Sequence, residues 1–459
     1  MREPASACAN IQGPRDCRQC LDDRGRHRLD LRKLVPPLRF EVVGERPEHR
    51  AQQPLLGRRI AGFEHPHVLR RHLRHLVAVH CGGKAVDVAA GEVPPTRRRR
   101  CRGGCVLHAL IRLVRAMRIA VVASPVTPLR PAQPGGAQAM VCDLALGLVR
   151  RGHQVAIHCV DGSEVPGVDL ITVPPPRDAA QALVMPRGRP APQAPGVAAA
   201  IAGMFDAIRS SRPDVVSQHA FDAPAFDQAR GLAALHTLHL PPLVPAVVAA
   251  AASTPAAQLA TVSASMLRAW RAAGVDVGRV LRNGVEDVDV PDGAPEHLAL
   301  VAGRISPEKG IEDALTAARL AGLPARVAGA VYDPAYDVDL QGAERLGELT
   351  RLELRRVMAR SAVTICAVRW DEPFGLVAAE AQMAGCPVAA YDRGAVPEVV
   401  EDGVSGFLAI PDDTGALAAA IERCLTLDRG EVRASARRRL SLDGAVDGYE
   451  SALMEIASS

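Results

Sequence analysis

Short apolar runs alternate with longer amphipathic stretches from Met117 to the end of the chain. Runs of about four to eight apolar residues are typical of strands buried in a parallel sheet, and apolar residues that recur every three or four positions are typical of helices. The pattern predicts strands at 118–124, 155–158, 215–218, 234–236, 258–262 and 280–282, and a second series at 298–302, 325–328, 362–366 and 387–390. It therefore predicts an α/β protein with two parallel sheets.

Helices are predicted between these strands, at 137–151, 197–209, 311–321, 352–360, 375–384, 415–427 and 446–456. The first of them ends at Gly152, and glycine commonly terminates helices. The Pro- and Arg-rich stretch 174–195 interrupts the alternation and is predicted to be a surface loop or lid. The apolar stretch 241–257 gives no clear prediction, whereas the acidic stretch 287–296 is predicted to link two domains.

Charge separates residues 1–116 from the rest of the chain. That segment carries 24 Lys and Arg against 11 Asp and Glu, whereas residues 117–459 carry 31 against 40. It holds eight of the fourteen histidines and six of the eleven cysteines, contains no Trp or Tyr, and shows little periodicity. We predict that residues 1–116 are a disordered extension, or upstream sequence added by a start codon assigned too early. The domains are then expected at 117–290 and 291–440, with a final helix in 441–459.

Two other interpretations of residues 1–116 are weaker. Zinc binding would need an ordered set of ligands, but the spacing fits no familiar zinc finger and Arg97–Arg100 would repel a cation. The candidate ligands are Cys17, Cys20, Cys101, Cys105, His67, His72, His75 and His80. An Arg-rich arm attracts nucleic acid, but aromatic residues for base stacking are nearly absent from this one. We expect no nucleic-acid binding by residues 117–459.

The sequence predicts neither a secretory signal nor a membrane span. The most apolar stretch near the junction, Val106–Val122, is interrupted by Arg112, Arg115 and Arg118, and charged residues are costly inside a bilayer. The five cysteines after Met117 stand singly among apolar neighbours, which is typical of reduced, buried thiols. We therefore expect a cytoplasmic protein with at most peripheral membrane contact.

The most informative chemistry lies in residues 372–380, Glu-Pro-Phe-Gly-Leu-Val-Ala-Ala-Glu. Glu372 precedes a predicted helix start, and Glu380 lies inside that helix. Between them, Gly375 permits close approach to the backbone, and the unpaired amides of the first turn favour an anion such as phosphate. The two carboxylates can accept hydrogen bonds from sugar hydroxyls. This segment therefore predicts a pocket for a nucleotide sugar.

A single lysine, Lys309, occurs in residues 117–459, where arginine is otherwise the cation. It lies in the segment 303–310, together with Arg304, directly after the apolar run 298–302. An ammonium group is a compact point charge that suits a diphosphate oxygen. We therefore predict that Arg304 and Lys309 stabilise the negative charge that develops on a diphosphate leaving group.

At these residues the chain resembles the retaining glycosyltransferases of family 4, which have the GT-B fold. The similarity runs from Met117 to the C-terminus and rests on 303–310 followed by 372–380, with shorter matches at 135–136, 283–285, 397–400 and 402–407. The resemblance implies two Rossmann-like domains facing a central cleft, and a last helix that crosses back to the first domain. It also implies transfer of a hexose from a UDP-, GDP- or ADP-sugar to an unidentified acceptor hydroxyl, without a metal or other cofactor.

The resemblance assigns roles to the matching residues. Glu372 would hold hydroxyls of the donor sugar, and Glu380 would accept hydrogen bonds from the ribose. The full donor-binding set is Gly135, Gly136, Arg304, Lys309, Phe374, Gly375, Leu376, Val377 and Glu380. His219 follows the strand 215–218, at the carboxyl edge where α/β sheets bind ligands, and would orient the reacting hydroxyl as a catalytic residue. His236 and His239, after a later strand, are the alternatives on the acceptor side.

Competing activities fit the residues less well. An NAD oxidoreductase needs G-x-G-x-x-G between the first strand and helix, and residues 124–136 lack it. A glycosidase would use two carboxylates but no diphosphate site. The Asp-x-Asp sequences at 287–289 and 337–339 fall in a linker and a polar loop, so neither predicts a metal site. A phosphorylase, an epimerase and a catalytically silent nucleotide-sugar-binding protein remain alternatives, and the sequence does not predict the oligomeric state.

Overall fold

The computed structural model describes residues 116–130, 136–182, 194–287, 289, 294–331, 336–340 and 342–459. Gly135 and nearly all of the extension expected at 1–116 lie outside the described residues, as does most of the second half of the loop expected at 174–195.

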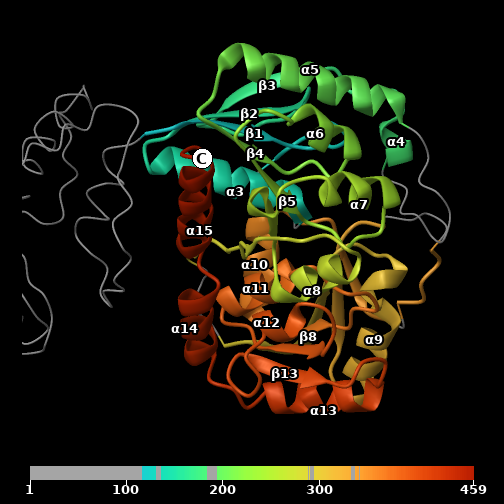
Figure 1. The fold of residues 1–459 in the computed structure, drawn as a ribbon. Helices are drawn as coiled ribbons and strands as arrows, with labels where there is room; N and C mark the ends of the chain where they lie inside the picture. Colours follow the sequence, from blue (N-terminus) through green and yellow to red (C-terminus); the bar gives the residue numbers. More distant parts are fainter. Residues whose placement is uncertain are drawn as a thin grey trace, which may run out of the picture. The chain divides into compact units, whose positions relative to one another are not determined.

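The first half of the described chain forms a parallel sheet with the strand order β3-β2-β1-β4-β5-β6-β7. In chain order the strands are β1 (Arg118–Val122), β2 (Gln154–Val160), β3 (Asp169–Val173), β4 (Val215–Gln218), β5 (Ala234–Leu238), β6 (Leu259–Thr261) and β7 (Arg279–Val280). The helices are α3 (Gly136–Arg150), α4 (Ala179–Ala182), α5 (Pro195–Ser211), α6 (Ala223–Gln228), α7 (Pro245–Ala252) and α8 (Ala264–Ala272). We call this sheet and its helices the first lobe (Figure 1).

The second half repeats this plan with the strand order β10-β9-β8-β11-β12-β13, again all parallel. Its strands are β8 (Glu296–Ala302), β9 (Ala325–Ala328), β10 (Glu344–Gly347), β11 (Ser361–Cys366), β12 (Val388–Tyr391) and β13 (Gly406–Ala409). Its helices are α9 (Ile311–Leu320), α10 (Arg351–Arg360), α11 (Leu376–Met383), α12 (Val396–Val399), α13 (Thr414–Cys424) and α14 (Arg429–Arg439). We call it the second lobe, and the predicted class of two Rossmann-like sheets is confirmed.

Both sheets are buried on their two faces, which explains the continuous apolar runs in the sequence. In β1, Ile119 and Val121 belong to a core with α3, whereas Ala120 and Val122 belong to a separate core with α5. This alternation follows from the two-residue period of a strand. The second lobe has the same arrangement, with α9 and α13 over one face of its sheet and α10 and α11 over the other.

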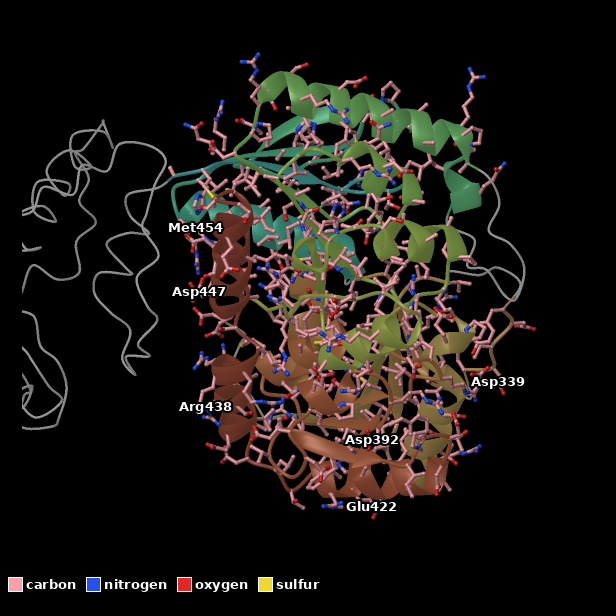
Figure 2. The ribbon with its side chains drawn as sticks, viewed as in Figure 1. Asp339, Asp392, Glu422, Arg438, Asp447 and Met454 are labelled. Carbon is pink, nitrogen blue, oxygen red and sulfur yellow. The ribbon has the colours of Figure 1, made fainter. Side chains whose placement is uncertain are left out.

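The last helix, α15 (Leu442–Ile456), packs on the first lobe. Its buried side chains, which include Val446 and Leu453, share a core with α3 and β1. Charged contacts fix the same packing, because Glu450 Oε1 lies 3.0 Å from His153 Nε2 and Glu450 Oε2 lies 2.6 Å from Arg151 Nη1. Asp447 and Met454 lie along this helix, beyond Arg438 on α14 (Figure 2).

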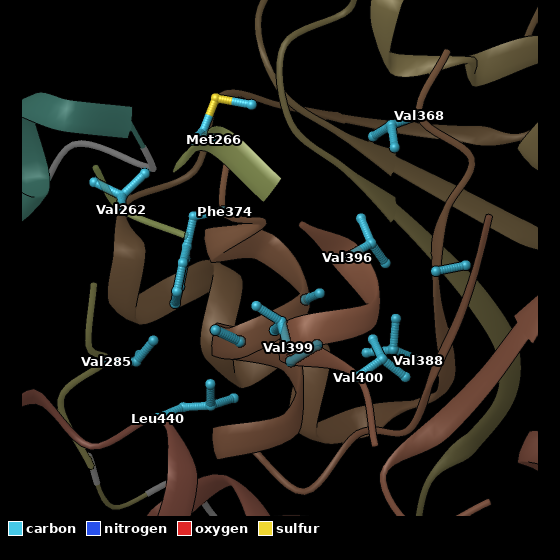
Figure 3. Packing of buried hydrophobic residues seen from close by; sticks show 14 of the residues in the cluster. Val262, Met266, Val285, Val368, Phe374, Val388, Val396, Val399, Val400 and Leu440 are labelled. Atoms are coloured by element: carbon cyan, nitrogen blue, oxygen red, sulfur yellow. The ribbon is translucent and has the colours of Figure 1, made fainter. Parts of the chain in front are cut away.

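One apolar core joins the two lobes. Val262 and Met266 from the first lobe belong to the same buried cluster as Phe374, Val396 and other residues of the second (Figure 3). A carboxylate strengthens this junction, because Glu398 accepts hydrogen bonds from the first two amides of α8, at 2.9 Å from Ala264 N and 2.7 Å from Ser265 N. These amides have no partner within their own helix, so an acidic residue stabilises them.

Several elements of the structure were not predicted from the sequence. They are the strands β3, β10 and β13 and the helices α4, α6, α8, α12 and α14, and α7 occupies part of the stretch 241–257 that gave no prediction. The strands β3 and β10 are only partly buried, so they lack long apolar runs. Helix α14 is missing from the prediction because it buries only Val432, Ser435 and Ala436 among many arginines. The five cysteines after Met117 are unpaired, four of them are buried, and Cys366 is partly buried.

Candidate active site

The loop after β8 brings Lys309 to the end of β11. Lys309 ends a short 3-10 helix, and the next residue, Gly310, has a φ of 60°. A Cβ atom on Gly310 would collide with the carbonyl oxygen of Ala367, just beyond β11. Only glycine tolerates both the left-handed backbone and this close approach. The Arg369 amide also donates to the Glu308 carbonyl at 2.9 Å, which fixes the loop against the segment that carries Glu372.

Glu372 holds two donors on one carboxylate oxygen. Its Oε2 accepts from Lys309 Nζ at 2.8 Å and from Trp370 Nε1 at 2.8 Å. The ammonium also lies 5.5 Å from the centre of the Trp370 ring. The Lys309 and Glu372 side chains are 17% and 13% exposed, so water reaches both, and neither is locked in the interior. We name these three side chains the Lys309–Glu372–Trp370 cluster.

The cluster lies next to the N-terminus of α11, which begins one residue after the predicted helix start. Gly375 precedes the helix with a φ of 98°, and no side chain of the described residues caps the first turn. Leu376 and Val377 therefore present backbone amides without an intrahelical partner. Phe374 is buried beneath them in the core that joins the lobes. On the other side, Gly394 packs so closely on the Glu372 backbone that any side chain there would collide with it.

Arg304 follows Gly303 on the same loop and stays half exposed. Its Nη2 lies 3.4 Å from Glu308 Oε1, which also accepts from Ser306 Oγ at 2.7 Å. The two predicted cations thus lie in one short segment, and each contacts a carboxylate: Arg304 that of Glu308, and Lys309 that of Glu372.

Glu380 is more deeply buried than Glu372, the other carboxylate that the sequence singled out. It is only 2% exposed, and its Oε1 lies 3.2 Å from Arg351 Nε and 3.4 Å from Arg355 Nη2. Arg351 in turn makes a bidentate pair with Asp143 of α3, with both N–O distances at 2.9 Å. Glu380 Oε2 is buried and has no hydrogen-bond partner among the described residues. Glu380 therefore keeps one acceptor oxygen available.

Charge within this group is balanced despite the burial. Burial alone disfavours the charged form of Arg351, but its hydrogen bonds and its attraction to Asp143 and Glu380 raise its pKa. Arg355 has a lowered pKa, because burial outweighs the attraction of Glu380. Two guanidinium groups thus face two carboxylates in a region that excludes most water.

The predicted histidines are buried together at the carboxyl ends of β4 and β5. His219 Nδ1 lies 3.0 Å from His239 Nε2, and His219 Nε2 lies 2.8 Å from Ser217 Oγ. Both ring nitrogens of His219 therefore have partners within the protein. His236 instead stacks on Phe226, with ring centres 4.7 Å apart.

Burial sets the protonation state of all three rings. It lowers the pKa of His236 and of His239 to about 4. The pKa of His219 is lowered well below its ordinary value by burial and by repulsion from the other two imidazoles. At neutral pH all three rings are uncharged, so each has one nitrogen that donates and one that accepts.

Several residues of the site were not predicted, although the sequence carries a signal for some of them. Trp370 is one of two tryptophans in the chain and stands two positions before Glu372. Asp143 is the one acidic residue of α3 and lies among its buried apolar positions. Arg351 and Arg355 are four positions apart, and this spacing places them on one face of α10. No pattern, however, links Asp143 to Arg351 across 208 positions.

The described residues contain no group of three or more His, Cys, Asp or Glu side chains that could hold a metal ion. Of the Asp-x-Asp sequences, Asp287 pairs with Arg433 and Arg437 of α14. In the same part of the chain, no helix has the length and apolar character that a membrane crossing requires.

Two covered parallel sheets, a shared core between them and a final helix that returns to the first define the GT-B class of fold. Comparison with known proteins identifies the family. A model described as Glycosyltransferase Family 4 matches residues 134–288, and one described as Glycosyl transferases group 1 matches residues 290–440. Together the two matches span more than half of the chain. The chain therefore belongs to glycosyltransferase family 4, as predicted.

The relatives share part of the sequence, and solved structures share the fold. A glycogen synthase of Mycobacterium tuberculosis is 32% identical over 184 residues, 36% of this chain and 44% of the relative. A D-inositol 3-phosphate glycosyltransferase of Mycobacterium marinum is 34% identical over 167 residues, 34% of this chain and 36% of the relative. The chain thus matches less than half the length of these relatives.

Among structures, AviGT4, a glycosyltransferase involved in avilamycin A biosynthesis, has a TM-score of 0.56 and 21% identity, covering 75% of this chain and 98% of its own. Anabaena Alr3699/HepE, solved with UDP and glucose, has a TM-score of 0.56 and 19% identity, covering 74% of this chain and all of its own. At these identities the likeness establishes the fold.

Proposed function

We propose that this protein transfers a sugar from a nucleoside diphosphate sugar to an acceptor hydroxyl, with retention of the anomeric configuration. The observation that carries the proposal is the Lys309–Glu372–Trp370 cluster beside the open N-terminus of α11. A compact cation and unpaired amides suit a diphosphate, and a carboxylate one contact away suits the hydroxyls of the attached sugar. The structure of Alr3699/HepE with UDP and glucose supports this class of donor.

Each residue then has a defined part in the reaction. Breaking the bond between the anomeric carbon and the diphosphate leaves negative charge on the phosphate oxygens. Lys309, Arg304 and the first amides of α11 stabilise that charge, and removing one such donor typically costs about 10²–10³ in rate. The protein's own cations do this, so the reaction needs no metal cofactor. Retention follows when the acceptor hydroxyl attacks the anomeric carbon on the face from which the diphosphate leaves. An oxygen of the leaving diphosphate takes the acceptor's proton, and no protein nucleophile is required.

On the ribose side, Glu380 offers its unpaired Oε2 to a hydroxyl of the nucleoside. On the acceptor side, the neutral pair of His219 and His239 positions the incoming hydroxyl. Because both nitrogens of His219 are occupied, His239 is the better candidate for direct contact. The donor is enclosed when the lobes close over it, which keeps water from the reactive sugar.

The test is a titration of the full chain with UDP-glucose, GDP-mannose and ADP-glucose, and with free UDP, GDP and ADP, all in EDTA. One donor and its free nucleotide should raise the midpoint of thermal unfolding in a saturable way. The Lys309→Ala variant should lose this stabilisation. A matched control, Arg319→Ala, removes an exposed cation at the end of α9 in the same lobe and should keep it. If none of the six ligands stabilises the protein, the diphosphate site is wrong.

The occupied nitrogens of His219 favour one second candidate, a nucleotide-sugar-binding protein without transfer activity. A product assay separates the two. A transferase releases free nucleoside diphosphate and forms a glycoside when offered a mixture of candidate acceptors, whereas a silent binding protein does neither at saturating donor. The same assay reveals an epimerase or a phosphorylase, whose products retain the nucleotide or require inorganic phosphate.

A further inference from the structure

A buried chain of charges connects the two lobes through the predicted ribose contact. It runs from Asp143 on α3 to Arg351 on α10, then to Glu380 on α11, and Arg355 contacts the same Glu380 oxygen as Arg351. The side chains are 9%, 10%, 2% and 4% exposed in that order. We name these four residues the interlobe ion chain.

Local structure fixes the geometry of the interlobe ion chain. Helix α10 begins at Arg351 because Thr350 and Glu353 form a capping box, with the Thr350 side chain accepting from the Glu353 amide. This start places Arg351 in the first turn and Arg355 one turn later on the same face. Helix α11 packs alongside, and its Glu380 lies between the two guanidinium groups.

The interlobe ion chain would be an unfavourable arrangement if it served only to stabilise the fold. Removing four charged groups from water costs several times what a single hydrogen bond returns, and apolar residues of similar volume often serve as well or better. Two buried atoms of the interlobe ion chain, Glu380 Oε2 and Arg355 Nε, have no partner among the described residues. Buried unpaired polar atoms are uncommon and require an explanation. An acceptor and a donor on adjoining side chains match the needs of a hydroxyl group, which both donates and accepts.

We propose that Arg351 is a positioning residue that couples nucleoside binding to the contact between the lobes. Arg351 fixes Glu380 Oε1, so that Oε2 stays directed to the ribose hydroxyls. Asp143 fixes Arg351, and Asp143 belongs to the first lobe. The arrangement of Glu380 that binds ribose is therefore most stable when α3 and α10 are in contact. By linkage, a bound ribonucleotide must stabilise the same contact by an equal amount.

This inference rests on the proposed function, and its test is a cycle between a residue and a ligand. Binding of UDP, GDP and ADP is measured by calorimetry on the full chain, together with binding of their 2′,3′-dideoxy forms, which lack the ribose hydroxyls. Asp143→Asn keeps the shape of the side chain but removes its charge. We expect it to weaken the preferred ribonucleotide about fivefold to fiftyfold, within the usual range of coupling between sites. It should change binding of the dideoxy form less than about twofold.

Two further variants complete the experiment. Arg351→Gln should behave as Asp143→Asn does, and Arg351→Lys keeps a buried cation where the glutamine variant does not fold. The control is Asp287→Asn, which removes a carboxylate that pairs with Arg433 and Arg437 without contacting the interlobe ion chain. It should bind both nucleotide forms as the unaltered protein does.

The outcomes separate the inference from the proposed function. If no nucleotide binds the unaltered protein, the proposed function fails. If nucleotides bind and Asp143→Asn weakens the ribose and dideoxy forms equally, the ion chain is structural and the inference is wrong. An Asp143→Asn variant that binds the ribonucleotide normally would also overturn it.

Discussion

Trp370 gives the candidate site its sharpest test at the scale of a single residue. Its indole N–H donates to the same Glu372 oxygen that holds Lys309. Trp370→Phe keeps an aromatic ring beside the ammonium but removes that donor. We expect at least about a tenfold fall in kcat/KM for the donor, because Glu372 loses a partner that fixes its orientation, together with a loss of thermal stability, because a hydrogen bond to a charged group contributes about 1.5–3 kcal/mol to folding. Steady-state kinetics measure the first and calorimetry the second, and unchanged kinetics would remove Trp370 from the site.

Gly310 allows a prediction that separates strain from collision. Its positive φ would strain an alanine by about 1–2 kcal/mol, and the new methyl group would also meet the Ala367 carbonyl. Gly310→Ala should therefore lower the melting temperature and abolish donor stabilisation, because Lys309 moves with the loop. Gly322→Ala is the matched control, since Gly322 has a φ of 70° and a methyl group added there would meet nothing within 4 Å. The Gly322→Ala variant should lower the melting temperature by the backbone strain alone and should bind the donor normally.

At the scale of elements, dense apolar runs predicted strands well. The bounds predicted for β4 and β9 are those of the structure, since both strands lie inside a sheet with neighbours on each side. The edge strands β3 and β10 and the arginine-rich α14 were missed, because partial burial leaves no continuous apolar signal, and the short edge strand β13 was missed although it is mostly buried. Lys309 and Glu372 were each singled out by a local feature of the sequence, although their contact was not predicted, whereas the Asp143–Arg351 pair depends on how two lobes meet and has no local pattern.

The packing of α15 on α3 depends on one small residue. A Cβ atom on Gly147 of α3 would lie 2.6 Å from Val446 Cγ2 of α15, and valine has little rotamer freedom with which to move away. Gly147→Ala should therefore destabilise the protein despite its better helix propensity, and Val446→Ala should cost about 0.5–2 kcal/mol for the lost burial. The double variant should be more stable than the sum of the two changes predicts, by about 1 kcal/mol. Urea unfolding measures all three, and simple additivity would mean that the helices separate freely.

At the scale of the whole molecule, buried histidines set the response to acid. The pKa values of His158, His236 and His239 are lowered to about 4, and that of His219 is also lowered, all chiefly by burial. Well above pH 6.5, the ordinary pKa, both the folded and the unfolded chain hold these rings neutral. As the pH falls from 6.5 toward 4, these histidines bind protons in the unfolded chain but not in the folded chain. The free energy of unfolding therefore falls by up to about 1.4 kcal/mol per histidine per pH unit. Asp222, whose pKa is raised to about 6 by burial, partly opposes this trend below pH 6.

Urea midpoints at pH 7.5, 6.5, 5.5 and 4.5 test this expectation. The midpoint should fall least between the first two values and most steeply between the last two. His158 has both ring nitrogens buried without a partner among the described residues, so His158→Leu should reduce the acid slope by about one proton. A midpoint independent of pH across this range would mean that the rings are not buried in the neutral form.

The return of α15 to the first lobe also has a consequence for synthesis on the ribosome. Strand β1 is made before the whole second lobe, yet its core with α3 is completed by the 15 residues of α15, which follow that lobe in the chain. The second lobe can close its own sheet as it emerges, whereas the first lobe keeps an open apolar surface until α15 has been made. A nascent chain stalled before Leu442 should therefore expose α3 to protease while β8 to β13 are already protected, and chaperones that bind nascent chains should favour the earlier half.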